Sequence, residues 1–185
     1  MRKRPLGQTG VMVSELSLGT WGLSGDGYGP VQEADADRVI DRAVQLGFSL
    51  FDTADVYGFA TSQLGAMERK LARRLPQAKT QVVTKIGTQV EGYPEKRFDE
   101  QSLFMAFERS EERLARSPLD VVLPHNPSCA TLRRDDAVGK LAQLKSDGRV
   151  LAWGVSAGSA AVARLAVERG ADVVEIAFNA FHAAD

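Results

Sequence analysis

The stretch FDTADVYG, residues 51–58, interrupts an apolar run with the carboxylate of Asp52 and, five residues later, presents the phenol of Tyr57. Residues 49–51 are typical of a strand, and Gly58 allows the chain to turn away. We therefore expect Asp52 at the carboxyl end of a strand and Tyr57 on the loop beyond it. Parallel α/β folds build their active sites at that end of their strands. A loop carboxylate more often caps a turn, so the rest of the chain decides between the two interpretations.

Strand-like and helix-like segments alternate along the rest of the chain. Strands are predicted at residues 16–20, 49–52, 81–87, 119–123, 150–156 and 173–178. Helices are predicted from apolar periodicity and from Gly or Pro stops at residues 33–46, 61–75, 99–116, 136–147 and 160–169. Asp99 is the expected N-cap of the third helix. Strands spaced mostly about 30 residues apart with a helix between each pair are βαβ units, whose strands are parallel. The fold class is therefore α/β.

An open doubly wound sheet and a (β/α)8 TIM barrel both fit this alternation. The first strand is not followed by Gly-x-Gly-x-x-Gly, the dinucleotide fingerprint of the open sheet, and this favours the barrel. Residues 3–6 and 11–14 flank a glycine-bracketed turn and predict an N-terminal β-hairpin that acts as a lid or plug. We expect a single domain, residues 1–185, that is an incomplete barrel of about six βα units.

The expected barrel is about two βα units short at its C-terminal end, since a complete one typically has about 250 residues. Three explanations stay open. The chain is a fragment of a longer polypeptide, it forms a homo-oligomer through its open barrel edges, or it is a degenerate relative that has lost catalysis.

Composition excludes several classes of function. The 185 residues are 44% hydrophobic and 25% charged, and the formal net charge of −1 lacks the basic excess typical of proteins that bind nucleic acid or anionic membranes. A single cysteine, Cys129, rules out an internal disulfide, and with only two histidines it argues against a metal site. The chain has neither an apolar run of about 20 residues nor a signal-peptide core. We expect a cytoplasmic protein with no membrane partner.

Three predicted strands carry an ionisable group near the carboxyl end: Asp52, Lys85 and His125. Singly, each has a structural explanation, such as a lysine stem covering apolar surface. Together they converge, because parallel strands share one edge. Asp52 can supply the counter-charge that a buried Lys85 needs, and the Lys85 ammonium is expected to lower the pKa of Tyr57. With a neutral His125 to orient a carbonyl oxygen, the group is a proton donor that needs a redox cofactor.

In this order, the motifs LGTWG (residues 18–22), FDTADVYG, VTK (residues 83–85) and HNP (residues 125–127) resemble the aldo-keto reductase family. The resemblance covers essentially the whole chain. It implies a (β/α)8 barrel that binds NADPH or NADP at its carboxyl face and reduces a small aldehyde or ketone. The family's four catalytic positions fall on Tyr57 as general acid, Lys85 as its pKa modulator, Asp52 as the partner of Lys85, and His125 as the residue that orients the carbonyl.

The resemblance also implies a cofactor site, at Gly19, Thr20, Trp21, Asp52, Ser156 and Glu175. Two positions depart from the family pattern: Ala157 replaces an Asn that holds the nicotinamide carboxamide, and Glu175 replaces a Gln. The family's last two strands, with its phosphate-binding loop, are not expected before Asp185. These departures keep a second interpretation open, a catalytically impaired binding or regulatory protein. A metal-dependent barrel hydrolase using Asp52 and His125 is a weaker third.

The identity of the carbonyl substrate cannot be predicted from the residues. Three loop aromatics on the carboxyl face, Trp21, Tyr28 and Tyr93, are candidates to line an aromatic substrate pocket. Loop aromatics also serve to pack the loop itself.

Overall fold

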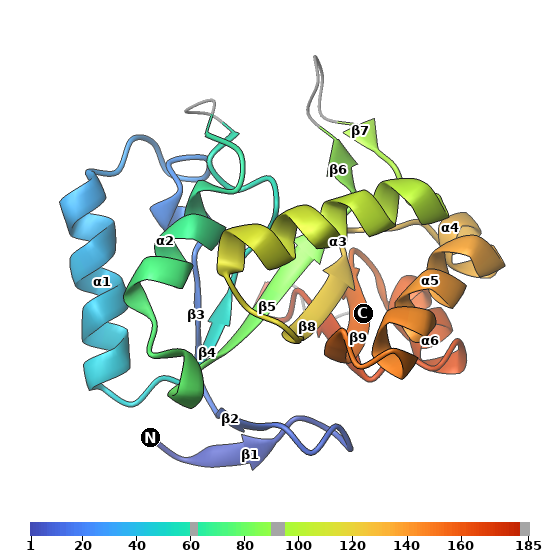
Figure 1. The fold of residues 1–185 in the computed structure, drawn as a ribbon, viewed down its shortest axis with the longest axis horizontal. Helices are drawn as coiled ribbons and strands as arrows, with labels where there is room; N and C mark the ends of the chain where they lie inside the picture. Colours follow the sequence, from blue (N-terminus) through green and yellow to red (C-terminus); the bar gives the residue numbers. More distant parts are fainter. Residues whose placement is uncertain (60–62, 90–94, 182–185) are drawn as a thin grey trace.

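Six parallel strands form one curved sheet in the computed structural model, which describes residues 1–59, 63–89 and 95–181. Their order across the sheet is β10 (Val173–Ile176), β9 (Val150–Ala157), β8 (Leu119–Pro124), β5 (Gln81–Ile86), β4 (Leu50–Asp52) and β3 (Ser17–Gly19). The order follows the chain without the reversal that defines a doubly wound sheet. The fold is therefore α/β with a six-stranded partial TIM barrel, as predicted (Figure 1). Within the described residues, β3 and β10 are the edge strands of this sheet.

The predicted N-terminal hairpin is also confirmed, and it plugs the amino end of the sheet. It consists of β1 (Lys3–Pro5) and β2 (Met12–Ser14), paired antiparallel. Ser14 Oγ accepts hydrogen bonds from the backbone N–H groups of Ser49, at 2.8 Å, and Leu50, at 3.2 Å. The hairpin thus fixes the start of β4, at the opposite end of the sheet from Asp52 (Figure 1).

Helices cover the outer face of the sheet (Figure 1). They are α1 (Glu33–Gln45), α2 (Ala66–Arg74), α3 (Glu100–Leu114), α4 (Cys129–Arg133), α5 (Asp135–Ser146) and α6 (Ala160–Glu168), with short 3-10 helices η1 (Trp21–Leu23) and η3 (Gln77–Lys79). The predicted N-cap of α3 is confirmed, because the Asp99 side chain accepts a hydrogen bond from the Ser102 N–H. None of the helices in the described part of the chain is long and apolar enough to cross a membrane.

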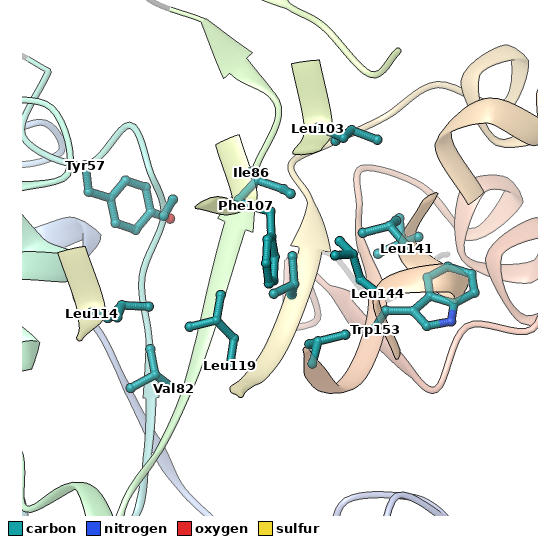
Figure 2. Packing of buried hydrophobic residues seen from close by; sticks show 14 of the residues in the cluster. Tyr57, Val82, Ile86, Leu103, Phe107, Leu114, Leu119, Leu141, Leu144 and Trp153 are labelled. Atoms are coloured by element: carbon teal, nitrogen blue, oxygen red, sulfur yellow. The ribbon is translucent and has the colours of Figure 1, made fainter. Parts of the chain in front are cut away.

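The core lies on both faces of the sheet. On the outer face, side chains of α3 and α5 pack against the strands, with Phe107 near Ile86 and Trp153 beside Leu141 and Leu144 (Figure 2). On the inner face a smaller cluster gathers around Val83, Val121, Leu123 and Ala152, with Leu6 of the hairpin against it. All six residues of β8 are buried. Leu119 and Val122 belong to the larger cluster and Val121 and Leu123 to the smaller one, while Asp120 pairs with Arg116.

Three features differ from the sequence predictions. Helix α2 begins at Ala66, so residues 63–65 of the predicted helix are not helical, because Gly65 has a positive φ of 66° and lies against the Arg113 side chain. Residues 61 and 62 of that prediction lie outside the described residues. The short hairpin β6 (Thr88–Gln89) and β7 (Glu95–Lys96) and the helix α4 were not predicted, since two to five residues carry too little periodicity. Tyr93 lies outside the described residues.

Candidate active site

Lys85 lies at the centre of a charged cluster at the carboxyl edge of the sheet. Its side chain is only 2% exposed, and its ammonium forms ion pairs with Asp52 Oδ2 and, at 3.2 Å, with Glu175 Oε1. Asp52 ends β4 and pairs in register with Val83 on β5, so the Lys85 side chain emerges two residues further along. The expected contact between Lys85 and Asp52 is present. The contact with Glu175 was not predicted.

Tyr57 is held beside this cluster by the loop after β4. Backbone hydrogen bonds tie that loop to β5: Thr53 N–H donates to Val83 O at 2.8 Å, and Asp55 N–H donates to Lys85 O at 2.9 Å. The Tyr57 side chain is buried, and its ring points from the loop towards β5 (Figure 2). The Lys85 Nζ atom lies 5.6 Å from the centre of the Tyr57 ring.

His125, directly after β8, completes the group. Its ring meets that of Tyr57 edge to face, with centres 6.1 Å apart and planes at 82°. Its backbone N–H donates to Ile86 O at 2.9 Å, and His125 forms a β-bridge to Ser156. The buried Nδ1 atom has no hydrogen-bond partner within the described ranges. The structure therefore brings Asp52, Lys85, Tyr57 and His125 together.

A pocket of about 600 Å³ opens beside these side chains. Its wall includes Trp21, Tyr57, Lys85, His125, Ser156 and Glu175. Tyr28 does not line the pocket but packs on Trp21, with ring centres 5.5 Å apart. Asp52 lies behind Lys85 and does not line the pocket either.

Burial dominates the electrostatics of the carboxyl and phenol groups. It raises the pKa of Asp52 to about 7, opposed by Lys85 and reinforced by Glu175. It also raises the pKa of Tyr57, because desolvation of the phenolate outweighs the attraction of the Lys85 ammonium. Lys85 does lower the pKa of Tyr57, as predicted, but burial raises it by more, so the expected net lowering of that pKa is wrong.

The pKa values of the two basic groups of the site shift in opposite directions. Burial alone would lower the pKa of Lys85, but the charges of Asp52 and Glu175 raise it above its ordinary value. Burial lowers the pKa of His125 to about 3, with further contributions from Lys96 and Lys85. The imidazole is therefore neutral near neutral pH, as expected, and suited to hydrogen-bond an oxygen atom.

The predicted cofactor residues divide into two groups. Trp21, Ser156 and Glu175 line the pocket. Gly19 and Thr20 do not: Thr20 is fully buried, and its hydroxyl donates to the Asp52 backbone oxygen at 2.9 Å. These two residues thus contact Asp52 and do not face the pocket.

Sequence reasoning passed over Asn126, which lines the pocket next to His125. Its backbone has a positive φ of 55°, and its N–H donates to Ser156 O at 3.0 Å. The sequence feature that indicates Asn126 is its position directly after His125, just beyond the end of a strand. Its amide, the Ser156 hydroxyl and the Trp21 ring fit the carboxamide and flat ring of a nicotinamide. In the described part of the lining, Lys85 is the one cation, and two carboxylates already pair with it.

Relatives of this chain are found over nearly its whole length. Residues 15–184 match the group described as "Aldo/keto reductase family". A Glycine max protein described as "Probable aldo-keto reductase 1" is 33% identical over 156 residues, which make up 83% of this chain and 44% of that protein. An aldo-keto reductase from Bacillus halodurans, in its holo form, superposes with a TM-score of 0.84 at 23% identity, over 96% of this chain and 58% of that one.

A glycerol dehydrogenase from Gluconobacter oxydans superposes with a TM-score of 0.75 at 28% identity, over 93% of this chain and 54% of that one. The chain thus spans about half the length of these three relatives. The family match extends over almost all of its residues. The chain therefore belongs to the aldo/keto reductase family.

Proposed function

We propose that this chain acts in the NADPH-dependent reduction of a small aldehyde or ketone to an alcohol, with Tyr57 as the general acid. The observation that carries the proposal is the position of Tyr57, which lines the pocket with the Lys85 ammonium 5.6 Å and the His125 ring centre 6.1 Å from the centre of its ring. A phenol that lies near both a cation and a neutral imidazole suits proton transfer to a developing alkoxide. Membership of the family supports the same reaction.

Each side chain has a distinct role in this proposal. Tyr57 carries the proton that reaches the carbonyl oxygen, and its raised pKa keeps it protonated before the reaction. The Lys85 ammonium stabilises the phenolate that remains after proton transfer. His125, neutral because of its burial, hydrogen-bonds the carbonyl oxygen and orients it.

The bound nicotinamide would supply the hydride that none of these side chains can donate. Trp21, Ser156 and Asn126 would hold its ring and carboxamide, since they line the pocket beside Tyr57. Ala157 also lines the pocket and offers only a methyl group where the family pattern has an amide. Asn126 and Ser156 must therefore provide most of the polar contacts to the carboxamide.

The test is the loss of NADPH absorbance at neutral pH with a panel of aliphatic and aromatic aldehydes. We expect turnover by the parent chain and a loss of about 10²–10⁴-fold in Tyr57→Phe, which keeps the ring and removes only the hydroxyl. Tyr28→Phe is the matched control, because Tyr28 packs on Trp21 outside the pocket lining. Absence of turnover, or equal turnover in Tyr57→Phe and the parent, would refute the proposal.

A second candidate is a binding or regulatory protein that has lost catalysis. It is favoured by one observation, that Lys85, the one cation in the described lining of the pocket, is already paired with Asp52 and Glu175. Titration calorimetry with NADPH separates the two candidates. Binding of NADPH with a Kd in the micromolar range supports the reductase. The absence of any heat of binding supports the binding protein.

A further inference from the structure

Glu175 lies on the edge strand β10 and contacts Lys85 across the width of the sheet. Lys85 is on β5, Asp52 is on the adjacent β4, and Glu175 is on β10, three strands away in the other direction. In a flat sheet three strand spacings amount to about 14 Å. The curvature of the half-barrel closes this gap to the 3.2 Å that separates Lys85 Nζ from Glu175 Oε1.

The position of the Glu175 carboxylate is set by the strand pair that lines the pocket. Glu175 pairs in register with Ser156 on β9, and the Ser156 hydroxyl donates to Glu175 Oε1 at 3.4 Å. The Glu175 side chain is 42% exposed, whereas that of Lys85 is 2% exposed. The carboxylate thus faces solvent on one side and the buried ammonium on the other.

We propose that Glu175 is a positioning residue, which holds the Lys85 ammonium between β4 and β10 and places a second negative charge beside the Tyr57 phenol. The contact with Lys85 stands by itself, and its value for proton donation rests on the proposed reductase function. With Asp52 and Glu175 ionised, the two carboxylates exceed the single ammonium by one charge. This excess opposes the formation of a phenolate at Tyr57.

The ionisable groups near the phenol come from several elements of the fold. They are Asp52 from β4, Lys85 from β5, His125 from the end of β8, Glu175 from β10 and Asp26 from the loop after η1. Burial is the largest cause of the raised pKa values of both Asp52 and Tyr57, and the charge of Glu175 raises each further. Removing that charge frees the ammonium to stabilise the phenolate.

The test is a phenolate titration of the 185-residue chain, followed by absorbance near 295 nm without cofactor or substrate. Subtracting the titration of Tyr57→Phe isolates the Tyr57 phenol from the two other tyrosines. We expect Glu175→Gln, which keeps the size of the side chain, to lower the midpoint of Tyr57 by about one pH unit. Glu175→Asp, which keeps the charge but shortens the side chain, gives a smaller decrease.

Glu168→Gln is the matched control, because it removes the same charge from an exposed position at the end of α6. In Glu168→Gln, we expect the titration midpoint of the Tyr57 phenol to equal that of the parent. A midpoint that is unchanged or higher in Glu175→Gln, or that falls equally in Glu168→Gln, overturns the proposal. Because the titration needs no turnover, a shift without NADPH oxidation supports the role of Glu175 and refutes the reductase. NADPH turnover without a shift of the Tyr57 midpoint refutes the role of Glu175 and supports the reductase.

Discussion

The ammonium of Lys85 and the ring of Tyr57 lie 5.6 Å apart, between nitrogen and ring centre, on two segments that backbone hydrogen bonds tie together. This distance makes Lys85 the nearest source of positive charge for a phenolate at Tyr57 in the pocket lining described above. Its loss should therefore be felt in the acid strength of the phenol.

Lys85→Met keeps the length of the stem and removes the charge. We expect the pKa of Tyr57 to rise further, because Lys85 is the group that lowers it against burial. Carbonyl reduction should fall by about 10²–10⁴-fold, as measured by kcat in the NADPH assay. Lys140→Met, on α5, is the control and keeps the parent's kcat. A Lys85→Met variant with the parent's kcat would contradict the prediction.

His125 should carry no charge across the physiological pH range. Its pKa is lowered from 6.5 to about 3, mainly by burial. Between these pH values the imidazole is neutral in the folded protein, whereas in the unfolded chain it is protonated. The imidazole C–H resonances of His125 should stay constant between about pH 5 and pH 8 in NMR spectra. The spectrum of His125→Asn assigns them, since the chain has two histidines. A titration midpoint between 6 and 7, in the range of an ordinary imidazole at about 6.5, would disprove this.

The sequence was enough to predict that Asp52, Lys85 and His125 lie close together. Each lies at or within one residue of the end of a strand, and the carboxyl ends of parallel strands share one edge whatever the details of packing. The N-cap at Asp99 was predictable for a similar reason, because a cap depends on a few consecutive residues. Their roles in a reaction stay predictions.

Features that depend on distant packing were not predictable. The contact between Lys85 and Glu175 requires the curvature of four strands, and the family resemblance placed Glu175 only in the cofactor site. The raised pKa of Tyr57 depends on how completely the ring is buried, which no local pattern encodes. The late start of α2 depends on Gly65, where the Arg113 side chain leaves no room for a Cβ atom.

Asp55 should make the protein less stable as pH rises. Burial and the nearby charge of Glu68 raise its pKa from 3.8 to about 7, and its buried Oδ1 atom has no hydrogen-bond partner in the described part of the chain. Between these pH values the folded state holds a proton that the unfolded state has lost. The free energy of unfolding therefore falls with pH, by up to about 1.4 kcal/mol per unit from this group.

Asp55→Asn removes this titration and keeps one oxygen to accept from the Gly87 N–H, as Asp55 Oδ2 does at 3.2 Å. Urea denaturation at pH 5 and pH 7.5 should show a smaller loss of stability in the variant than in the parent. Asp135→Asn, at an exposed position on α5, is the control and leaves the difference unchanged. An equal loss of stability in Asp55→Asn and the parent would rule out this role for Asp55.

Gly154 on β9 should be indispensable for the pairing of β9 with β10. A Cβ atom at this position would lie 1.9 Å from the backbone oxygen of Val173, a clash that no side-chain rotation relieves. Gly154→Ala should cost at least about 3 kcal/mol in chemical denaturation and speed the hydrogen exchange of the β10 amides. Gly139→Ala, in α5 with open space around its Cβ, should instead gain about 0.5–1 kcal/mol. Because β10 carries Glu175, Gly154→Ala should also lower the phenolate midpoint of Tyr57, and an unchanged midpoint with β10 detached would show that Glu175 does not act on Tyr57.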